Sequence, residues 1–144
     1  MKNNHRTKKI LLIDDDPTFC FFMQTVAKKH GIKLDTYHQL VDATYGKTRI
    51  QDFDALILDY DLGDMTGVEV AEYVDYFMGG VPVLLISSNH RRARPLDPWP
   101  SSVIGFVHKN EGYENIFDAV LQTEGANEEF VSFLQNEEDV GHEL

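Results

Sequence analysis

Residues 10–17 read Ile-Leu-Leu-Ile-Asp-Asp-Asp-Pro, an apolar run that stops abruptly at three carboxylates. A short, β-branched run bounded by turn-forming residues is typical of a buried strand. Three later runs have the same form: residues 55–58 stop at Asp59, residues 83–86 at Ser87, and residues 103–108 at Lys109. Strands buried on both faces belong to parallel sheets, which bind ligands beyond the carboxyl ends of their strands. The four runs therefore predict that carboxylates, a hydroxyl and an ammonium meet at one sheet edge.

Patterns typical of helices alternate with these strands. Asp16-Pro17 suits a helix cap followed by the first helical residue, and Gly31 suits the end of that helix. The remaining elements are predicted in order: a strand at 33–38, a weak helix at 40–49, a loop bracketed by Gly63 and Gly67, a helix at 68–77 and a helix at 113–121. The alternation predicts a doubly wound α/β fold with a five-stranded parallel sheet in the flavodoxin-like order 2-1-3-4-5.

The segment between Ser87 and Val103 breaks this alternation. Pro95, Pro98 and Pro100 disfavour a regular helix where the fourth one is due. The fourth helix is therefore expected to be degenerate or replaced by a proline-rich loop over residues 89–102. This loop, with its arginines and Trp99, is either an ordinary surface loop or a separate partner site.

Composition bounds the class of protein. The chain has 144 residues and a formal net charge of −11, which predicts one folded domain at 8–123 and argues against a nucleic-acid partner. Residues 1–7 form a basic tail, and residues 124–144 form an acidic tail or a short extra helix. The single cysteine, Cys20, excludes an internal disulfide framework and suits a buried thiol. Because no targeting or membrane-spanning run is found, a cytoplasmic protein without membrane contact is expected.

The residues gathered at the sheet edge suit phosphoryl transfer. A carboxylate can act as nucleophile toward phosphorus, and Mg²⁺ prefers carboxylate oxygens. Asp14, Asp15 and Asp59 supply such oxygens, while Lys109 and Ser87 can contact phosphoryl oxygens. Carboxylates ~4 Å apart repel by about 4 kcal/mol at an effective dielectric of 20. A divalent cation is therefore expected to stabilise the fold.

The chain resembles the receiver domain of two-component response regulators over about residues 8–123. The resemblance rests on Asp14-Asp15, Asp59, Ser87 and Lys109, which follow in this order on successive strand ends. The resemblance implies phosphorylation on Asp59 with Mg²⁺ or Mn²⁺, and the backbone carbonyl of Asp61 as a further metal ligand. It implies a histidine kinase or histidine phosphotransfer protein as the phosphoryl donor. Output to an unknown downstream protein would pass through protein contacts.

The resemblance also implies a switch. Ser87 moves toward the phosphate, and Phe106 fits the aromatic position that turns inward, although a strand aromatic equally suits the core. Asp61 and Asn89 match positions that set the lifetime of the phosphorylated state. The first helix is apolar around most of its circumference, and one side must face the core. On the remainder, Cys20 or Phe21 is either exposed, where it could dock the histidine kinase or phosphotransfer protein, or packed as an extra part of the core.

Three departures from the family pattern concern geometry and output. Asn110 stands where a proline usually follows the lysine, Gly63 stands where a proline is usual, and the fourth helix is replaced. Two alternatives stay open. One is a receiver-fold interaction module that is never phosphorylated. The other is a phosphatase, because Asp59-Tyr60-Asp61 resembles the Asp-x-Asp motif of haloacid-dehalogenase-like enzymes, with Asp59 as nucleophile and Asp61 as general acid.

Overall fold

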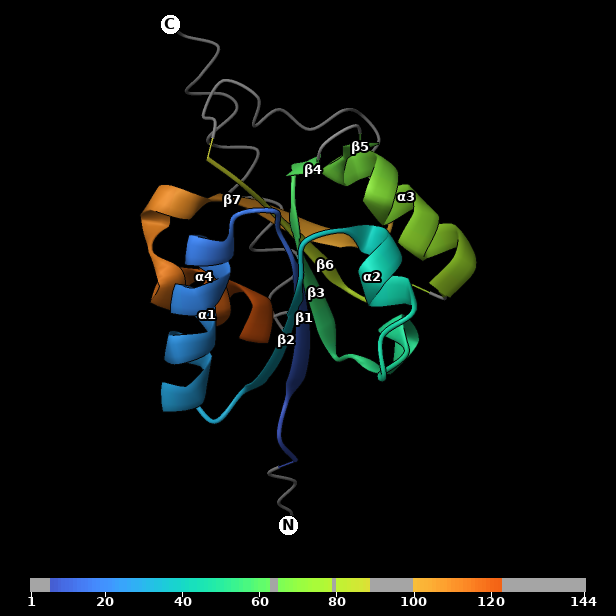
Figure 1. The fold of residues 1–144 in the computed structure, drawn as a ribbon. Coiled ribbons are helices and arrows are strands. Elements are labelled where there is room, and N and C mark those ends of the chain that lie inside the picture. Colours follow the sequence, from blue (N-terminus) through green and yellow to red (C-terminus); the bar gives the residue numbers. More distant parts are fainter. Residues whose placement is uncertain (1–5, 63–64, 79, 89–99, 123–144) are drawn as a thin grey trace, which may run out of the picture.

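The computed structural model describes residues 6–62, 65–78, 80–88 and 100–122. Five parallel strands form one sheet in the order β2-β1-β3-β6-β7 (Figure 1). Their bounds are β1 (Lys9–Ile13), β2 (Lys33–Tyr37), β3 (Ala55–Asp59), β6 (Val83–Ser87) and β7 (Val103–His108). Counted within this sheet alone, the order is 2-1-3-4-5, so the predicted fold class is confirmed.

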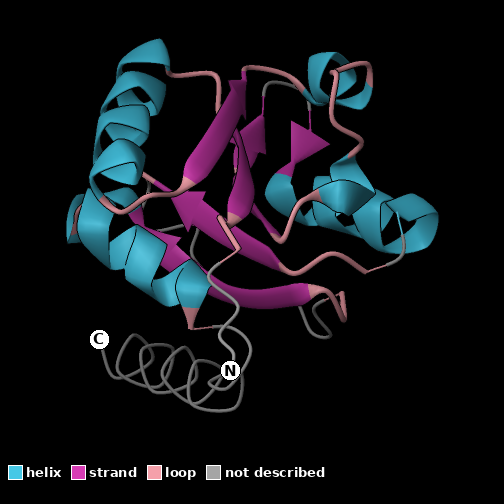
Figure 2. Cartoon of the chain, turned by 90° about the horizontal axis from the view of Figure 1, so that it is seen from below, coloured by secondary structure: helices cyan, strands magenta, loops and turns pink. Residues whose placement is uncertain are grey.

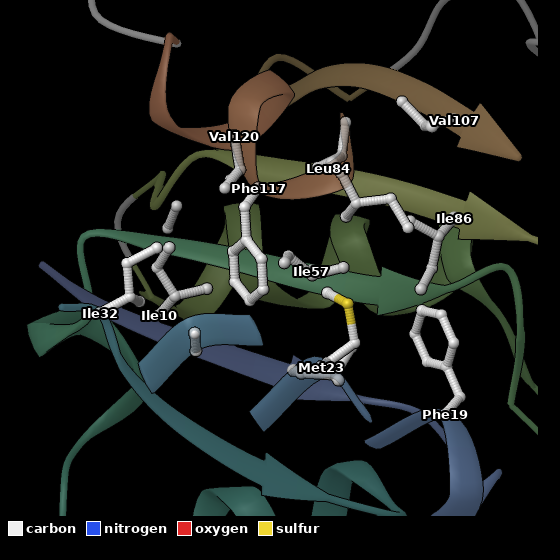
Figure 3. Packing of buried hydrophobic residues seen from close by; sticks show 14 of the residues in the cluster. Ile10, Phe19, Met23, Ile32, Ile57, Leu84, Ile86, Val107, Phe117 and Val120 are labelled. Carbon is white, nitrogen blue, oxygen red and sulfur yellow. The ribbon is translucent and has the colours of Figure 1, made fainter. Parts of the chain in front are cut away.

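Helices cover both faces of the sheet (Figures 1 and 2). The helices α1 (Pro17–Lys29) and α4 (Tyr113–Leu121) pack on one face, and α2 (Leu40–Thr44) and α3 (Gly67–Met78) pack on the other. Successive strand residues point to opposite faces, so Ile10 and Leu12 join the α1/α4 core while Leu11 and Ile13 join the α2/α3 core. Figure 3 shows the α1/α4 core, in which Phe117 and Met23 converge on Ile57.

The start of α1 follows from its first residues. The Asp16 carboxylate accepts hydrogen bonds from the backbone N–H groups of Thr18 (3.0 Å) and Phe19 (3.3 Å), and Pro17 is the first helical residue. The helix ends at Lys29, and Gly31 adopts a positive φ of 69° just beyond it. The predicted cap and end of this helix are confirmed.

Two elements differ from the sequence-based expectation. The weak helix expected at 40–49 is only α2 (Leu40–Thr44), followed by the 3₁₀ turn η1 (Ile50–Asp52). Its cap residue Gln39 makes no side-chain capping bond, and a helix this short has little stability of its own. At Gly46 a β-carbon would lie 2.3 Å from the Tyr37 hydroxyl oxygen, so the chain turns where only glycine fits without movement.

A pair of two-residue strands begins before the loop expected between Gly63 and Gly67 and ends within it. The strands are β4 (Asp61–Leu62) and β5 (Met65–Thr66), which pair antiparallel. Thr66 and Glu69 then form a capping box: the Thr66 N–H donates to Glu69 Oε1 (2.9 Å), and the Glu69 N–H donates to Thr66 Oγ1 (3.1 Å). The capping box therefore fixes the end of β5 to the first turn of α3.

Several expectations concern residues outside the described ranges. These are most of the basic tail at 1–7, the proline-rich segment up to Trp99, Asn89, and the acidic tail at 124–144. Of the segment at 89–102, the structure describes the last three residues, and there the Ser101 hydroxyl donates to the Asp75 carboxylate (3.2 Å). Within the described ranges, no helix has both the length and the apolar character that spanning a bilayer requires.

Candidate functional site

The four predicted residues meet at one edge of the sheet. Asp14 directly follows β1, Asp59 ends β3, Ser87 ends β6, and Lys109 directly follows β7. Because all five strands are parallel, their carboxyl ends share one edge, next to the β4–β5 hairpin in Figure 1. The adjacent strands β3 and β6 pair Asp59 with Ile86, so Ser87 lies one residue beyond the position beside Asp59.

Three carboxylates form a cluster at this edge. Asp14, Asp15 and Asp59 each offer one oxygen, and these oxygens lie within 4.8 Å of one another. Asp14 and Asp59 are buried, whereas Asp15 is exposed. The Asp14 Oδ1 atom accepts the backbone N–H of Asp16 (2.9 Å), and Asp59 Oδ1 accepts the N–H of Asp61 (3.3 Å). The second oxygen of each buried carboxylate lies near the Lys109 ammonium.

Lys109 brings the positive charge. Its Nζ atom lies 2.7 Å from Asp14 Oδ2 and 3.7 Å from Asp59 Oδ2, and its side chain is 15% exposed. A buried ion pair is stable only when both charges have partners, which the two aspartates provide for the ammonium. Lys109 thus contacts the two buried carboxylates at once.

The electrostatics leave negative charge in excess. The pKa of Asp59 is raised to about 7, first by burial and then by the charge of Asp14, against the opposing charge of Lys109. Burial also raises the pKa of Asp14, although Lys109 opposes this. For Lys109, burial alone would lower the pKa, but the hydrogen bond and charge of Asp14 and the charge of Asp59 outweigh burial and raise it. One ammonium does not balance the cluster.

The donor set fits a hard divalent cation. Such a cation takes carboxylate oxygens, and the cluster offers three within reach of one point. Asp14 Oδ2 is buried, and among the described residues it makes no hydrogen bond of good geometry beyond its ion pair with Lys109. A carboxylate oxygen can accept more than one partner, so Asp14 Oδ2 can contact a cation in addition to Lys109. Asp14, Asp15 and Asp59 therefore suit Mg²⁺ or Mn²⁺.

The two residues expected to act as a switch are both buried. Ser87 lies at the end of β6 without solvent exposure. Phe106 on β7 belongs to the α2/α3 core, and its ring centroid lies 5.7 Å from that of Tyr60. The ring therefore already points inward in this structure, as its core alternative predicts.

Other predicted residues divide by location. Asp61 is exposed at the start of β4, close to Asp59 in the chain. Its role as a carbonyl ligand and its effect on lifetime stay predictions, and Asn89 lies outside the described residues.

Asp16 acts as the cap of α1, as expected. Cys20 is buried, and its thiol donates to the Asp14 carbonyl oxygen (3.4 Å). Burial, and then the charges of Asp14 and Asp16, raise the pKa of this thiol to about 11.

The outer face of α1 carries two exposed rings. Of the two residues named as candidates for exposure, Cys20 is buried and Phe21 is 63% exposed. Phe22 is also 43% exposed, and its ring packs edge-on against Phe21 with centroids 5.5 Å apart. The alternative of Phe21 as core packing is therefore wrong, because the helix turns Phe19, Cys20 and Met23 toward the sheet.

Sequence reasoning missed two aromatic residues at the site. The Lys109 Nζ atom lies 4.6 Å from the centroid of the Phe19 ring, and the Tyr113 ring packs against Phe19 at 5.7 Å. Both contacts join α1 to the chain after β7. The sequence carries no local signal for them, beyond the place of Phe19 in the first turn after the aspartates.

Comparisons with known proteins agree with this geometry. Residues 10–121 match the family described as response regulator receiver domain. A curated relative, the transcriptional regulatory protein ZraR of Klebsiella oxytoca, is 22% identical over 107 residues. That match covers 74% of this chain and 24% of the relative, so the chain spans about a quarter of the relative's length.

Solved structures share the fold. A sensor protein from Polaromonas sp. JS666 is similar with a TM-score of 0.71 and 19% identity, over 82% of this chain and 96% of that chain. A CheY-like response regulator receiver domain protein from Methanospirillum hungatei JF-1 gives 0.70 and 15%, over 86% and 98%. The chemotaxis response regulator CheY4 of Vibrio cholerae gives 0.65 and 18%, over 82% and 99%. With a family match over most of its length, a parallel sheet in receiver order and the acidic edge described above, this chain belongs to the response regulator receiver domain family.

Proposed function

We propose that the protein accepts a phosphoryl group on Asp59 within a two-component phosphorelay. The observation that carries the proposal is the meeting of Asp59 with Asp14 and Asp15 within 4.8 Å, beside the Lys109 ammonium at 3.7 Å. Membership of the receiver family supports it, because receiver domains are signalling domains that in general take part with histidine kinases or phosphotransfer proteins. In the phosphatase alternative, Asp14 and Asp15 would have no role.

The proposed reaction uses Asp59 as the nucleophile. One carboxylate oxygen attacks the phosphorus of a phosphohistidine, the P–N bond breaks, and its electron pair leaves with the imidazole nitrogen. The product is an acyl phosphate on Asp59. Lys109, already 3.7 Å from Asp59 Oδ2, neutralises one phosphoryl oxygen, and the Ser87 hydroxyl donates to another. The reaction is a single transfer onto the protein itself, so the protein is not a turnover enzyme.

The proposed metal ligands are Asp14, Asp15, Asp59 and the backbone carbonyl of Asp61. A bound Mg²⁺ or Mn²⁺ supplies charge neutralisation and alignment of the phosphoryl oxygens. The raised pKa of Asp59, about 7, supports this assignment, because added positive charge favours the ionised carboxylate that the attack needs. Asp14 and Asp15 would hold the cation beside Asp59, where it would neutralise charge on the phosphoryl group.

The exposed rings on α1 support a docking role. We assign Phe21, with Phe22 beside it, as the contact for the histidine kinase or histidine phosphotransfer protein, since an exposed aromatic pair suits a protein interface. The proposed location is the cytoplasm, and the proposed output passes to an unknown downstream protein through protein–protein contacts. Ser87 and Phe106 are the proposed switch residues, and Asp61 and Asn89 are proposed to set the lifetime of the acyl phosphate.

A second candidate function is an interaction module that is never phosphorylated. The burial of Phe106 favours it, because a ring packed on Tyr60 in the α2/α3 core suits a core aromatic with no switching role. In such a module Phe106 would serve only as core packing.

The test is the intact mass of the protein after incubation with Mg²⁺ and a small acyl-phosphate donor. The wild type should gain one phosphate that hydroxylamine removes, and Asp59→Asn should gain none. Asp54→Asn is the matched control, because Asp54 precedes the same strand at its other end and should leave the adduct intact. A parallel assay with small phosphate esters checks the phosphatase alternative, for which hydrolysis by the wild type would be required.

The outcomes separate the candidates. An adduct on the wild type and on Asp54→Asn alone supports the phosphoacceptor. Absence of an adduct together with absence of stabilisation by Mg²⁺ would leave the interaction module as the function. Absence of an adduct despite stabilisation by Mg²⁺ would mean that the site binds metal and needs its phosphohistidine partner, which a phosphorylated histidine phosphotransfer protein would then supply.

A further inference from the structure

The ammonium of Lys109 has an aromatic neighbour as well as two carboxylates. Its Nζ atom lies 2.7 Å from Asp14 Oδ2 and 3.7 Å from Asp59 Oδ2, while the Phe19 ring centroid lies 4.6 Å away. A cation within about 6 Å of a ring face is attracted by the negative face of the ring. The lysine is therefore held by charge from the carboxylates and by the ring from α1.

The Phe19 ring is itself held in place. Its backbone N–H donates to the Asp16 carboxylate (3.3 Å) in the capped first turn of α1. Its ring packs on Tyr113, and Tyr113 in turn stacks on Phe22 with centroids 5.7 Å apart and planes 28° apart. Phe19 is buried and lies in the α1/α4 core, as the close view in Figure 3 shows. A ring fixed by its own backbone and by a neighbouring ring can fix a flexible side chain.

Lys109 needs such support. A lysine side chain has four flexible carbons, and its ammonium is a point charge without the fixed geometry of a guanidinium. The 2.7 Å contact alone would draw the ammonium to Asp14, one ångström nearer than Asp59. The Phe19 ring contacts the ammonium as a third partner and adds attraction that comes from neither carboxylate.

We infer that Phe19 is a positioning residue for phosphoryl transfer, whose ring keeps the Lys109 ammonium where it can serve both Asp14 and Asp59. This inference rests on the proposed phosphoacceptor function. Phe19 does not touch the reacting atoms, so it acts only through Lys109. The effect must therefore depend on the electron density of the ring face and on the presence of the lysine.

The test changes the ring face and keeps its shape. Phe19 is replaced by pentafluorophenylalanine, whose ring has nearly the same outline and an electron-poor face. The rate of phosphorylation by a small acyl-phosphate donor with Mg²⁺ should fall about three- to thirty-fold, the factor that a cation–π contact of ordinary strength represents. In Phe19→Leu, which removes the ring, the phosphorylation rate should fall at least as far. Phe19→Tyr should retain most of the wild-type rate.

Two controls separate positioning from packing. The same fluorinated residue at Phe117, a buried ring of the same core, should leave the rate unchanged. In a Lys109→Ala background, fluorination at Phe19 should cause no further loss, because the group through which it acts is gone. Stabilisation by Mg²⁺ should be the same in all Phe19 variants, since none of the three carboxylates is altered.

The result that overturns the inference is a wild type that takes phosphate and a fluorinated Phe19 variant that takes it equally fast. Equal slowing at Phe117 would overturn it as well, because the effect would then come from fluorination of the core. A wild type that takes no phosphate from either donor removes the proposed function, and the inference falls with it.

Discussion

An aspartate lies just before strand β3 and another is its last residue, and the protein shifts their pKa values in opposite directions. Asp54, just before the strand, accepts hydrogen bonds from the Arg6 guanidinium (3.3 Å from Nη1) and from the Lys9 N–H (2.8 Å). Burial alone would raise the pKa of Asp54, but these hydrogen bonds outweigh it and lower the pKa. Asp59, five residues on, has a pKa raised to about 7. One carboxylate stabilises the fold, and the other is kept at a cost.

The contrast indicates which end of the strand is structural. A carboxylate surrounded by donors needs nothing more, whereas a buried carboxylate beside another one stores repulsion that a cation or a phosphoryl group can relieve. Perturbed acids gather at functional sites for this reason. The largest expected effect on the difference between Asp54 and Asp59 is therefore that of adding a divalent cation.

Saturating Mg²⁺ should raise the free energy of unfolding of the wild type by about 3 kcal/mol at a hundred times its dissociation constant. It should leave a variant with Asp14→Asn and Asp59→Asn nearly unchanged, because two of the three clustered ligands are lost. Denaturant unfolding with and without Mg²⁺ measures both values. Equal stabilisation of the double variant would show that the cation binds elsewhere.

Asp59→Asn should stabilise the metal-free protein by about 2 kcal/mol at pH 8, because it removes a buried charge that lies beside Asp14. Asp54→Asn should act with the opposite sign and destabilise by about 1 kcal/mol, because it weakens a satisfied ion pair. Urea unfolding of the pair without metal is the measurement. Two changes of the same sign would break the comparison.

The same difference should depend on pH. The folded pKa of Asp59 is about 7 and its ordinary value is 3.8, so between these values the folded state binds more protons than the unfolded state. The contribution of Asp59 to stability therefore falls as pH rises through this window. The stability gained by Asp59→Asn should grow from pH 4 to 7 and level off above 7. In saturating Mg²⁺ the gain from Asp59→Asn should be lost, because the cation favours the ionised Asp59 carboxylate of the wild type and the variant lacks this ligand.

The smallest expected effect concerns the outer face of α1, which belongs to neither end of the sheet. Phe21→Ser should change the free energy of unfolding by less than about 0.5 kcal/mol, because Phe21 is mostly exposed. Phosphorylation by a small acyl-phosphate donor should be unchanged, and phosphotransfer from a phosphohistidine protein should slow. Loss of both activities would assign Phe21 to folding rather than to docking.

The predictable part of the site is the part that chain topology determines. Asp14, Asp59, Ser87 and Lys109 could be placed together because each follows an apolar strand, and parallel strands end on one edge. The cap by Asp16 was predictable from its neighbours, since capping is local. These features need only the order of elements and the identity of their end residues.

The remaining features depend on distances between elements. Which of Cys20 and Phe21 faces the sheet depends on the rotation of α1, and an apolar run around the whole helix does not determine it. The contact of Phe19 with Lys109 depends on how α1 lies against the end of β7. The β4–β5 hairpin consists of two-residue strands in a polar loop, where side-chain alternation is too short to read.

The site has one more property, which follows from its origin in four separate strands. Asp14, Asp59, Ser87 and Lys109 are brought together by the strand order itself, so no fragment that lacks β1 or β7 contains the whole set. For a single cooperative domain, competence to take phosphate should then vanish in denaturant at the same midpoint as the secondary structure. Under the proposed function, a phosphoryl donor would react only with the assembled sheet, and a partly folded chain would transmit no signal.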